Sequence, residues 1–228
     1  MSFDLVIFDC DGVLVDTEPL LNRVYVAMLG EFGIRVDPDE TLREFSGAAM
    51  SARLEAFHAR FGWRPGDDFK NKFYARLGDL IRTELAPVEG VSELLDALTV
   101  PSCVASNAMH SEIRKRLRRV GFLARFADAI LSAEDVERPK PAPDIYLLAA
   151  ERRRASPERC IVIEDSVPGV VAAKAAGMTV FGYAKLTDRG ALEKAGATTF
   201  AAMSELAARL SESSYGVCRA ETSPRPAP

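Results

Sequence analysis

The sequence contains no long apolar run, and no stretch of its 228 residues approaches the roughly 18 that a membrane-spanning helix requires. Its first residues, MSFDLVIFDCDG, carry acidic side chains where a secretory signal needs a basic region. We therefore expect a cytoplasmic protein with no membrane partner.

An excess of positive charge is also absent. Lys and Arg total 29 against 33 Asp and Glu, which gives a net charge of -4, whereas binding to a phosphate backbone requires a basic surface. We therefore do not expect nucleic acid as a partner. Two basic runs, 114–119 and 152–154, lie in helical patterns, and we expect them to form solvated faces.

Cysteine and histidine are scarce. The four cysteines have no metal-ligand spacing, and Cys10, Cys103 and Cys160 lie in apolar runs, so we expect buried, reduced thiols. Neither of the two histidines, His58 and His110, accompanies a nucleophile elbow. This inventory argues against a Ser-His-Asp hydrolase.

The remaining composition is that of a folded protein, with 48% apolar and 27% charged residues. At about 150 residues per domain, the length predicts one large domain plus a smaller partner. Short apolar runs alternate with longer helical patterns, which is typical of a parallel sheet flanked by helices. The predicted strands cover 5–8, 102–105, 129–131, 160–163 and 179–182, and the helical patterns between and after them cover 91–98, 111–120, 142–153, 168–176 and 204–210.

One mostly helical region, 16–86, interrupts this alternation and is too long for a loop. Helical patterns at 51–61 and 69–85 follow a first one that begins near residue 20. We therefore expect an α/β fold, a Rossmann-like parallel sheet with helices on both faces, plus an inserted small α-helical cap. The predicted core is 1–15 and 87–210, the cap is 16–86, and the Ser- and Pro-rich residues 211–228 form a flexible tail.

Acidic residues follow two of the predicted strands. Asp9 and Asp11 come after the first strand, and side chains two apart in an extended segment point the same way. Glu164 and Asp165 follow another strand end. Because ligands bind at the carboxyl ends of parallel strands, we expect Asp9, Asp11 and Asp165 to converge as an all-oxygen site suited to Mg²⁺.

Other polar groups lie at the same predicted edge. Ser106 and Asn107 end the second strand, and Lys140 stands between two prolines that restrict the backbone. A metal site, a carboxylate nucleophile, a fixed cation and small donors together indicate phosphoryl transfer.

At these residues the sequence resembles the haloacid dehalogenase (HAD) superfamily. The matching segments, in order, are DCDGVLVDTE at 9–18, Ser106-Asn107, Lys140 within RPKPAP, and IEDSVPGV at 163–170. The resemblance covers nearly all of 3–210 and implies a Mg²⁺-dependent phosphatase with a helical cap. Within the superfamily the chain is most similar to sugar-phosphate phosphatases related to 6-phosphogluconate phosphatase and to β-phosphoglucomutase.

The resemblance implies a role for each motif residue. Asp9 would be the nucleophile, and Asp11 the general acid and base. Mg²⁺ would be held by Asp9, the Asp11 backbone carbonyl and Asp165, with Glu164 acting through water. The remaining motif residues, Ser106, the Asn107 backbone and Lys140, would hold the phosphoryl oxygens, and Gly12 would let the backbone approach phosphate.

Substrate selection is expected in the cap, because the core supplies only phosphoryl chemistry. The candidate contacts to a small phosphorylated metabolite are Glu18, Gly47, Arg53 and Arg76. A phosphosugar mutase is the main alternative, although Leu21 stands where the resembling mutases carry a histidine. A phosphoglycolate phosphatase and a binding protein without activity also remain open, and we expect a monomer or weak homodimer.

Overall fold

The computed structural model describes residues 3–45, 50–212 and 215–218. Six parallel strands form one sheet in the order β3-β2-β1-β4-β5-β6. The strands are β1 (Leu5–Phe8), β2 (Ser102–Ser106), β3 (Ile130–Ser132), β4 (Cys160–Glu164), β5 (Thr179–Tyr183) and β6 (Thr198–Phe200). The predicted α/β fold is confirmed, and all five predicted strands are present.

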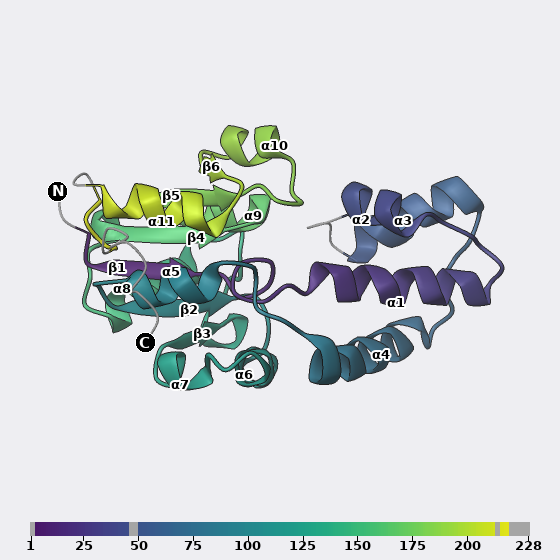
Figure 1. Ribbon diagram of the computed structural model, residues 1–228. Helices are drawn as coiled ribbons and strands as arrows, with labels where there is room; N and C mark the ends of the chain where they lie inside the picture. The colour runs from purple at the N-terminus through teal and green to yellow at the C-terminus, as the bar shows by residue number, and fades with distance from the viewer. Residues whose placement is uncertain (1–2, 46–49, 213–214, 219–228) are drawn as a thin grey trace, which may run out of the picture.

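Helices cover both faces of the sheet (Figure 1). Alternate strand residues face opposite ways, as strand geometry requires: Val6 and Phe8 belong to one buried cluster, Leu5 and Ile7 to another. The first cluster is covered by α5 (Val91–Ala97), α6 (His110–Arg119), α7 (Leu123–Phe126) and α11 (Met203–Ser211), and the second by α8 (Asp144–Arg152), α9 (Val167–Ala175) and α10 (Arg189–Lys194).

Four helices lie together to one side of the sheet (Figure 1): α1 (Glu18–Glu31), α2 (Pro38–Phe45), α3 (Met50–Phe61) and α4 (Phe69–Glu84). The two chain segments that lead to them run side by side, since Val15 pairs with Pro87 and the Asp16 amide donates to the Ala86 carbonyl at 3.0 Å. We propose the same division as from the sequence, with a cap at 16–86 between two parts of the core.

Four helices and strands differ from the prediction. The structure adds β6, α7 and α10, and it adds α2 within the cap. Strand β6 lies at the sheet edge, and two of its three residues are threonine, so no apolar run marks it. Helix α2 buries only Thr41 and Phe45.

The chain after α11 also differs from the expected flexible tail over 215–218. Val217 is fully buried, and its carbonyl accepts from the Thr99 amide at 2.8 Å. Tyr215 stacks on Phe3 with ring centroids 5.7 Å apart. The buried Val217 side chain and the stacked Tyr215 ring hold this segment against the core, although the tail as a whole is polar in composition. All four cysteines are buried and free, as predicted, and no described helix combines the length and apolar character needed to span a bilayer.

Aromatic side chains form the interior of the cap. The ring of Tyr25 on α1 lies 4.4 Å from that of Phe73 on α4 and 5.9 Å from that of Phe57 on α3. Phe73 is fully buried, whereas its neighbour Tyr74 is 58% exposed. The packing of these rings holds α1, α3 and α4 together.

We predict that Phe73→Ala destabilises the cap by about 3 to 5 kcal/mol, because it leaves a cavity among packed rings. Tyr74→Ala, the matched control, should cost less than about 1 kcal/mol. Urea unfolding followed by fluorescence of Trp63, the sole tryptophan of the chain and a cap residue, measures both. Equal losses in the two variants would contradict this account of the cap interior.

Candidate active site

Three carboxylates meet where β1 and β4 lie side by side. Phe8 pairs with Ile163 across these strands, and the Asp9 amide donates to the Ile163 carbonyl at 3.0 Å. This register brings Asp9, Glu164 and Asp165 to the carboxyl edge of the sheet, where one oxygen of each lies within 4.8 Å of the others. From β1 the chain adds β2 and β3 on one side of the sheet and then β4, β5 and β6 on the other, so the topological switch point lies between β1 and β4. Open α/β sheets bind ligands at this position.

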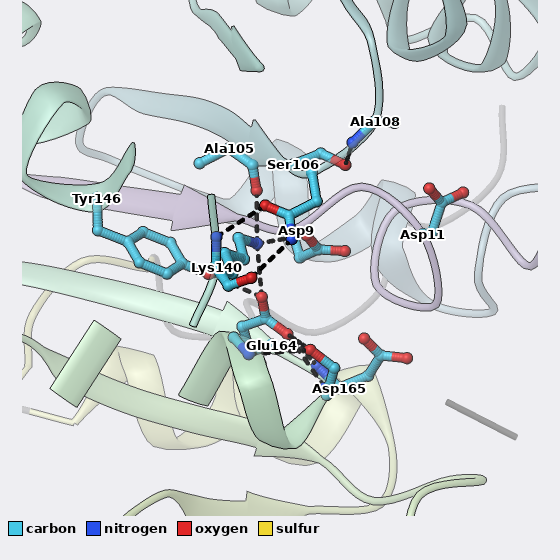
Figure 2. A network of polar contacts seen from close by, with 12 residues as sticks. Asp9, Asp11, Ala105, Ser106, Ala108, Lys140, Tyr146, Glu164 and Asp165 are labelled. Atoms are coloured by element: carbon cyan, nitrogen blue, oxygen red, sulfur yellow. Dashed lines mark hydrogen bonds and ion pairs between the residues drawn. The ribbon is translucent and has the colours of Figure 1, made fainter. Parts of the chain in front are cut away.

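Lys140 lies between two members of this cluster, Asp9 and Glu164 (Figure 2). Its side chain is 4% exposed, and Nζ donates to Asp9 Oδ1 at 2.6 Å, to Glu164 Oε1 at 2.6 Å and to the Ala105 carbonyl at 2.8 Å. Burial opposes the charged amine, but the two carboxylates raise the pKa of Lys140 well above its usual value. All three protons of a charged ammonium group are therefore engaged.

Asn107 fixes the backbone of Lys140. Its side-chain amide donates to the Lys140 carbonyl at 3.1 Å and accepts from the Lys140 amide at 3.0 Å. The peptide bond between Lys140 and Pro141 is cis. Ser106 is buried, and its hydroxyl accepts from the Ala108 amide at 3.2 Å. The Asn107 side chain thus holds the lysine segment, a role that the sequence did not indicate.

Glu164 is fully buried, and both of its oxygens accept hydrogen bonds. Oε1 accepts from Lys140 and from the Tyr146 hydroxyl at 2.7 Å. Oε2 accepts from the amides of Asp165 and Ser166, each at 3.1 Å, and from the Ser166 hydroxyl at 2.9 Å. Burial raises the pKa of Glu164, but Lys140 and these donors outweigh that effect and lower it. Tyr146 and Ser166 were missed from the sequence.

Asp9 and Asp165 carry more negative charge than the surrounding protein balances. Burial, together with the charges of Glu164 and Asp11, raises the pKa of Asp9 to about 7, although Lys140 opposes this. Burial raises the pKa of Asp165 well above its usual value, and the charges of Glu164 and Asp9 raise it further. Because Lys140 is shared between two carboxylates, a further cation would relieve this repulsion.

The residues present fit a hard divalent cation such as Mg²⁺, since the cluster offers carboxylate oxygens only. Gly12 makes room for the Asp165 carboxylate. Its φ is +78°, and a Cβ there would lie 2.0 Å from Asp165 Oδ2. Only glycine provides both the conformation and the space.

Asp11 does not join the carboxylate cluster, which corrects the predicted convergence with Asp9. Strand β1 ends at Phe8, and the loop turns at once, with the Leu14 amide donating to the Cys10 carbonyl at 3.0 Å. The extended geometry behind the prediction therefore ends before Asp11, whose side chain points away from Asp9 (Figure 2).

The Asp11 carboxylate contacts Arg116 on α6 instead. Arg116 Nη1 donates to Asp11 Oδ2 at 2.7 Å, and its side chain is 13% exposed. The expected solvated face over 114–119 is therefore wrong for Arg116. A signal was present, because position 116 shares the helix face of Ile113 and Leu117, which are both fully buried.

One predicted cap residue, Glu18, reaches the site, and a second, Arg53, contacts Glu18. Glu18 begins α1, and its carboxylate accepts from Arg53 Nη2 at 2.8 Å in a largely buried ion pair. The Arg53 guanidinium also lies over the Tyr25 ring at 5.4 Å. A recess beside Asp165 is lined by Gly12, Asp16, Glu18, Val88, Tyr183, Lys185, Leu186 and Thr187. Lys185, in the loop after β5, was missed from the sequence.

Arg76 lies elsewhere. Its Nη1 donates to Glu31 at 2.6 Å in an exposed ion pair. Glu31 ends α1 whereas Glu18 begins it, so at 1.5 Å per residue the two lie about 20 Å apart. Arg76 thus lies at the opposite end of α1 from Glu18, and its contact with substrate stays a prediction. Gly47 lies outside the described residues.

The parallel sheet with helices on both faces and the acidic cluster at its switch point define an α/β protein of the Rossmann-like class. The chain belongs to the haloacid dehalogenase-like hydrolases, whose family model matches residues 3–177. Its relatives are phosphatases, and it is a phosphoric monoester hydrolase of this family.

Three similar proteins illustrate the relationship. The chain is 33% identical to 6-phosphogluconate phosphatase of Escherichia coli (strain K12), over 89% of this chain and 92% of the relative. It is 31% identical to a phosphorylated carbohydrates phosphatase of Thermotoga maritima, over 89% and 96%. A HAD family hydrolase from Deinococcus radiodurans R1, solved with bound phosphate and sodium, is 33% identical, with a TM-score of 0.80 over 92% and 95%.

We predict that Gly12→Ala weakens Mg²⁺ binding at least about ten-fold, because the added methyl group displaces the Asp165 carboxylate. Gly33→Ala is the matched control, since Gly33 has a similar φ of +74° but no atom within 4 Å of an added Cβ. Both variants carry a backbone cost of about 1 kcal/mol. Calorimetric titration with Mg²⁺ separates them, and unchanged affinity in Gly12→Ala would contradict the packing against Asp165.

We also predict that Mg²⁺ raises the Tm more at pH 8 than at pH 5.5. The folded pKa of Asp9 lies near 7, above its usual 3.8, so without metal this group costs stability as the pH rises through that window. The pKa of Asp165 is also raised. Mg²⁺ would bind the ionised carboxylates of Asp9 and Asp165, and at the lower pH it would have to displace their protons. An equal Tm shift at both values would contradict the assignment, and Asp165→Asn provides a control that should reduce the shift.

Proposed function

We propose that the chain is a Mg²⁺-dependent phosphatase of small phosphorylated metabolites, in particular sugar phosphates such as 6-phosphogluconate. The observation that carries this proposal is the placement of Lys140 among Asp9, Glu164 and Asp165 at the switch point of the sheet. Two relatives, a 6-phosphogluconate phosphatase and a phosphorylated carbohydrates phosphatase, support the substrate class.

Asp9 and Asp165, with the Asp11 backbone carbonyl, are the ligands that we assign to Mg²⁺. The ion would supply positive charge to the oxygens of the transferring phosphoryl group. Glu164 has a different role in this proposal, because both of its oxygens already accept hydrogen bonds within the protein. It holds Lys140 in place and reaches the ion only through water.

Asp9 is the nucleophile that we assign. Its Oδ1 accepts from Lys140, and its second oxygen forms a bond to phosphorus while the bond from phosphorus to the substrate alcohol breaks. Asp11 donates a proton to the departing alcohol oxygen. Water then attacks the aspartyl phosphate, Asp11 takes a proton from that water, and the bond between phosphorus and Asp9 breaks to release phosphate.

Ser106, the Asn107 amide and Lys140 hold the phosphoryl oxygens in this scheme. They come from the end of β2 and from the segment that Asn107 fixes beside it. Lys140 already contacts the nucleophile, so a phosphoryl group bound there lies within reach of attack. Fixed donors of this kind cost no rearrangement during the reaction.

The cap and the recess beside Asp165 select the remainder of the substrate. Glu18, from the first turn of α1, is held by Arg53 and lines the recess together with Asp16 and Lys185. Carboxylates accept hydrogen bonds from sugar hydroxyls, and an ammonium group binds a sugar carboxylate. This set of side chains favours a polyhydroxylated substrate with an acidic group.

We expect the wild-type protein to release phosphate from 6-phosphogluconate in the presence of Mg²⁺. Asp9→Asn should lower kcat at least about 1,000-fold, because an amide cannot act as the nucleophile. Asp79→Asn, at an exposed position on α4, is the matched control. Phosphate release is measured across a panel of sugar phosphates and phosphoglycolate, with ³¹P NMR to detect transfer between sugar positions.

Residual turnover in Asp9→Asn above about one-hundredth of wild type would remove Asp9 as the nucleophile. A preference for phosphoglycolate, or transfer of phosphate to a second sugar position, would replace the proposed substrate class or reaction.

A further inference from the structure

Arg116 connects a core helix to the loop that carries Asp11. The two residues lie 105 positions apart in the sequence, and Arg116 Nη1 donates to Asp11 Oδ2 at 2.7 Å. The side chains are 13% and 35% exposed. A contact this buried between charged groups needs close geometry to offset the loss of hydration, so it is more than an incidental surface pair.

The pair uses only part of its hydrogen-bonding capacity. Asp11 Oδ1 and Arg116 Nε are both buried, and neither has a hydrogen-bond partner within the described chain. A guanidinium and a carboxylate commonly form two parallel hydrogen bonds, whereas the pair here forms one. One oxygen of Asp11 is thus held by Arg116 and the other is left for a further partner.

Helix α6 is anchored on both sides of Arg116. Ile113 and Leu117 are fully buried against the sheet. One turn further on, Arg119 Nη2 donates to the carbonyl of Thr83, in the last turn of cap helix α4, at 2.6 Å. Arg116 therefore extends from a helix that contacts both core and cap, at the border where a substrate between them would lie.

We propose that Arg116 is a positioning residue for Asp11: by holding Oδ2 at the border of core and cap, it fixes the carboxyl group for proton transfer to the leaving-group oxygen of the substrate. The proposal rests on the proposed function. Asp11 transfers its proton to the alcohol oxygen as the bond to phosphorus breaks, and Arg116 neither gives nor takes a proton.

The test separates substrates that need this proton from one that does not. The alcohol of 6-phosphogluconate is a poor leaving group without protonation, whereas p-nitrophenolate leaves from p-nitrophenyl phosphate unprotonated. Arg116→Met should lower kcat/KM for 6-phosphogluconate about 10- to 100-fold, since misplacement by about 1 Å has effects of this size. For p-nitrophenyl phosphate, we expect kcat/KM to fall less than about 3-fold, because this ratio reports only the steps up to release of the phenolate and excludes the later hydrolysis that both esters share.

Three further variants test the specificity of the effect. Arg116→Lys should recover most of the loss, because the pair uses a single donor that an ammonium group can replace. Arg118→Met, at an exposed position of the same helix, should leave both activities unchanged. Combined with Asp11→Asn, Arg116→Met should add less than about a 2-fold further loss, because the two residues act together.

Equal losses of kcat/KM on both substrates, or multiplicative losses in the double variant, would overturn the positioning role and leave Arg116 a structural residue. Unchanged turnover of 6-phosphogluconate in a folded Arg116→Met protein, verified by its thermal unfolding, would overturn it as well. Absence of turnover of both esters by the wild-type protein with Mg²⁺ would instead overturn the proposed function itself.

Discussion

A single buried ammonium group joins the ends of three neighbouring strands. Lys140 Nζ contacts Asp9 after β1, the Ala105 carbonyl in β2 and Glu164 at the end of β4. Two carboxylates can be buried at this edge of the sheet because the lysine lies between them and because Glu164 accepts further hydrogen bonds. Asn107 then fixes the backbone of the lysine segment. The site is thus built on the same contacts that close this edge of the sheet.

One lysine does not balance three acidic side chains, and this imbalance gives the site its chemistry. Glu164 is satisfied within the protein, whereas burial and acidic neighbours raise the pKa of both Asp9 and Asp165. The Asp165 carboxylate packs against Gly12, and only glycine at this position leaves room for it. The cap lies across this edge and brings Glu18 and Arg53 to it, so charge compensation in the core and substrate selection in the cap meet in one region.

Much of the fold could be predicted because strand and helix periodicities are local properties. All five predicted strands are present, and the two segments that bracket the cap pair at Val15 and Pro87. Strand β6 escaped prediction because two of its three residues are threonine, so no apolar run marks it. Arg76 and Arg53 looked alike in sequence, as arginines on amphipathic helices, yet one pairs with Glu31 at the surface and the other with Glu18 in the interior. Their difference depends on which helix each one faces, which no local pattern records.

The sequence by itself determined that acidic groups end β1 and β4, that a lysine follows in a proline-restricted segment, and that a helical insertion separates β1 from β2. These features are encoded in consecutive residues and in the parallel order of the strands. Only the tertiary structure decided which charges meet. It turned Asp11 away from Asp9 and toward Arg116, because β1 ends at Phe8 and α6 packs beside the loop. The physical reason is that electrostatic partners are set by distances across the fold, and those distances follow from packing between elements remote in the chain.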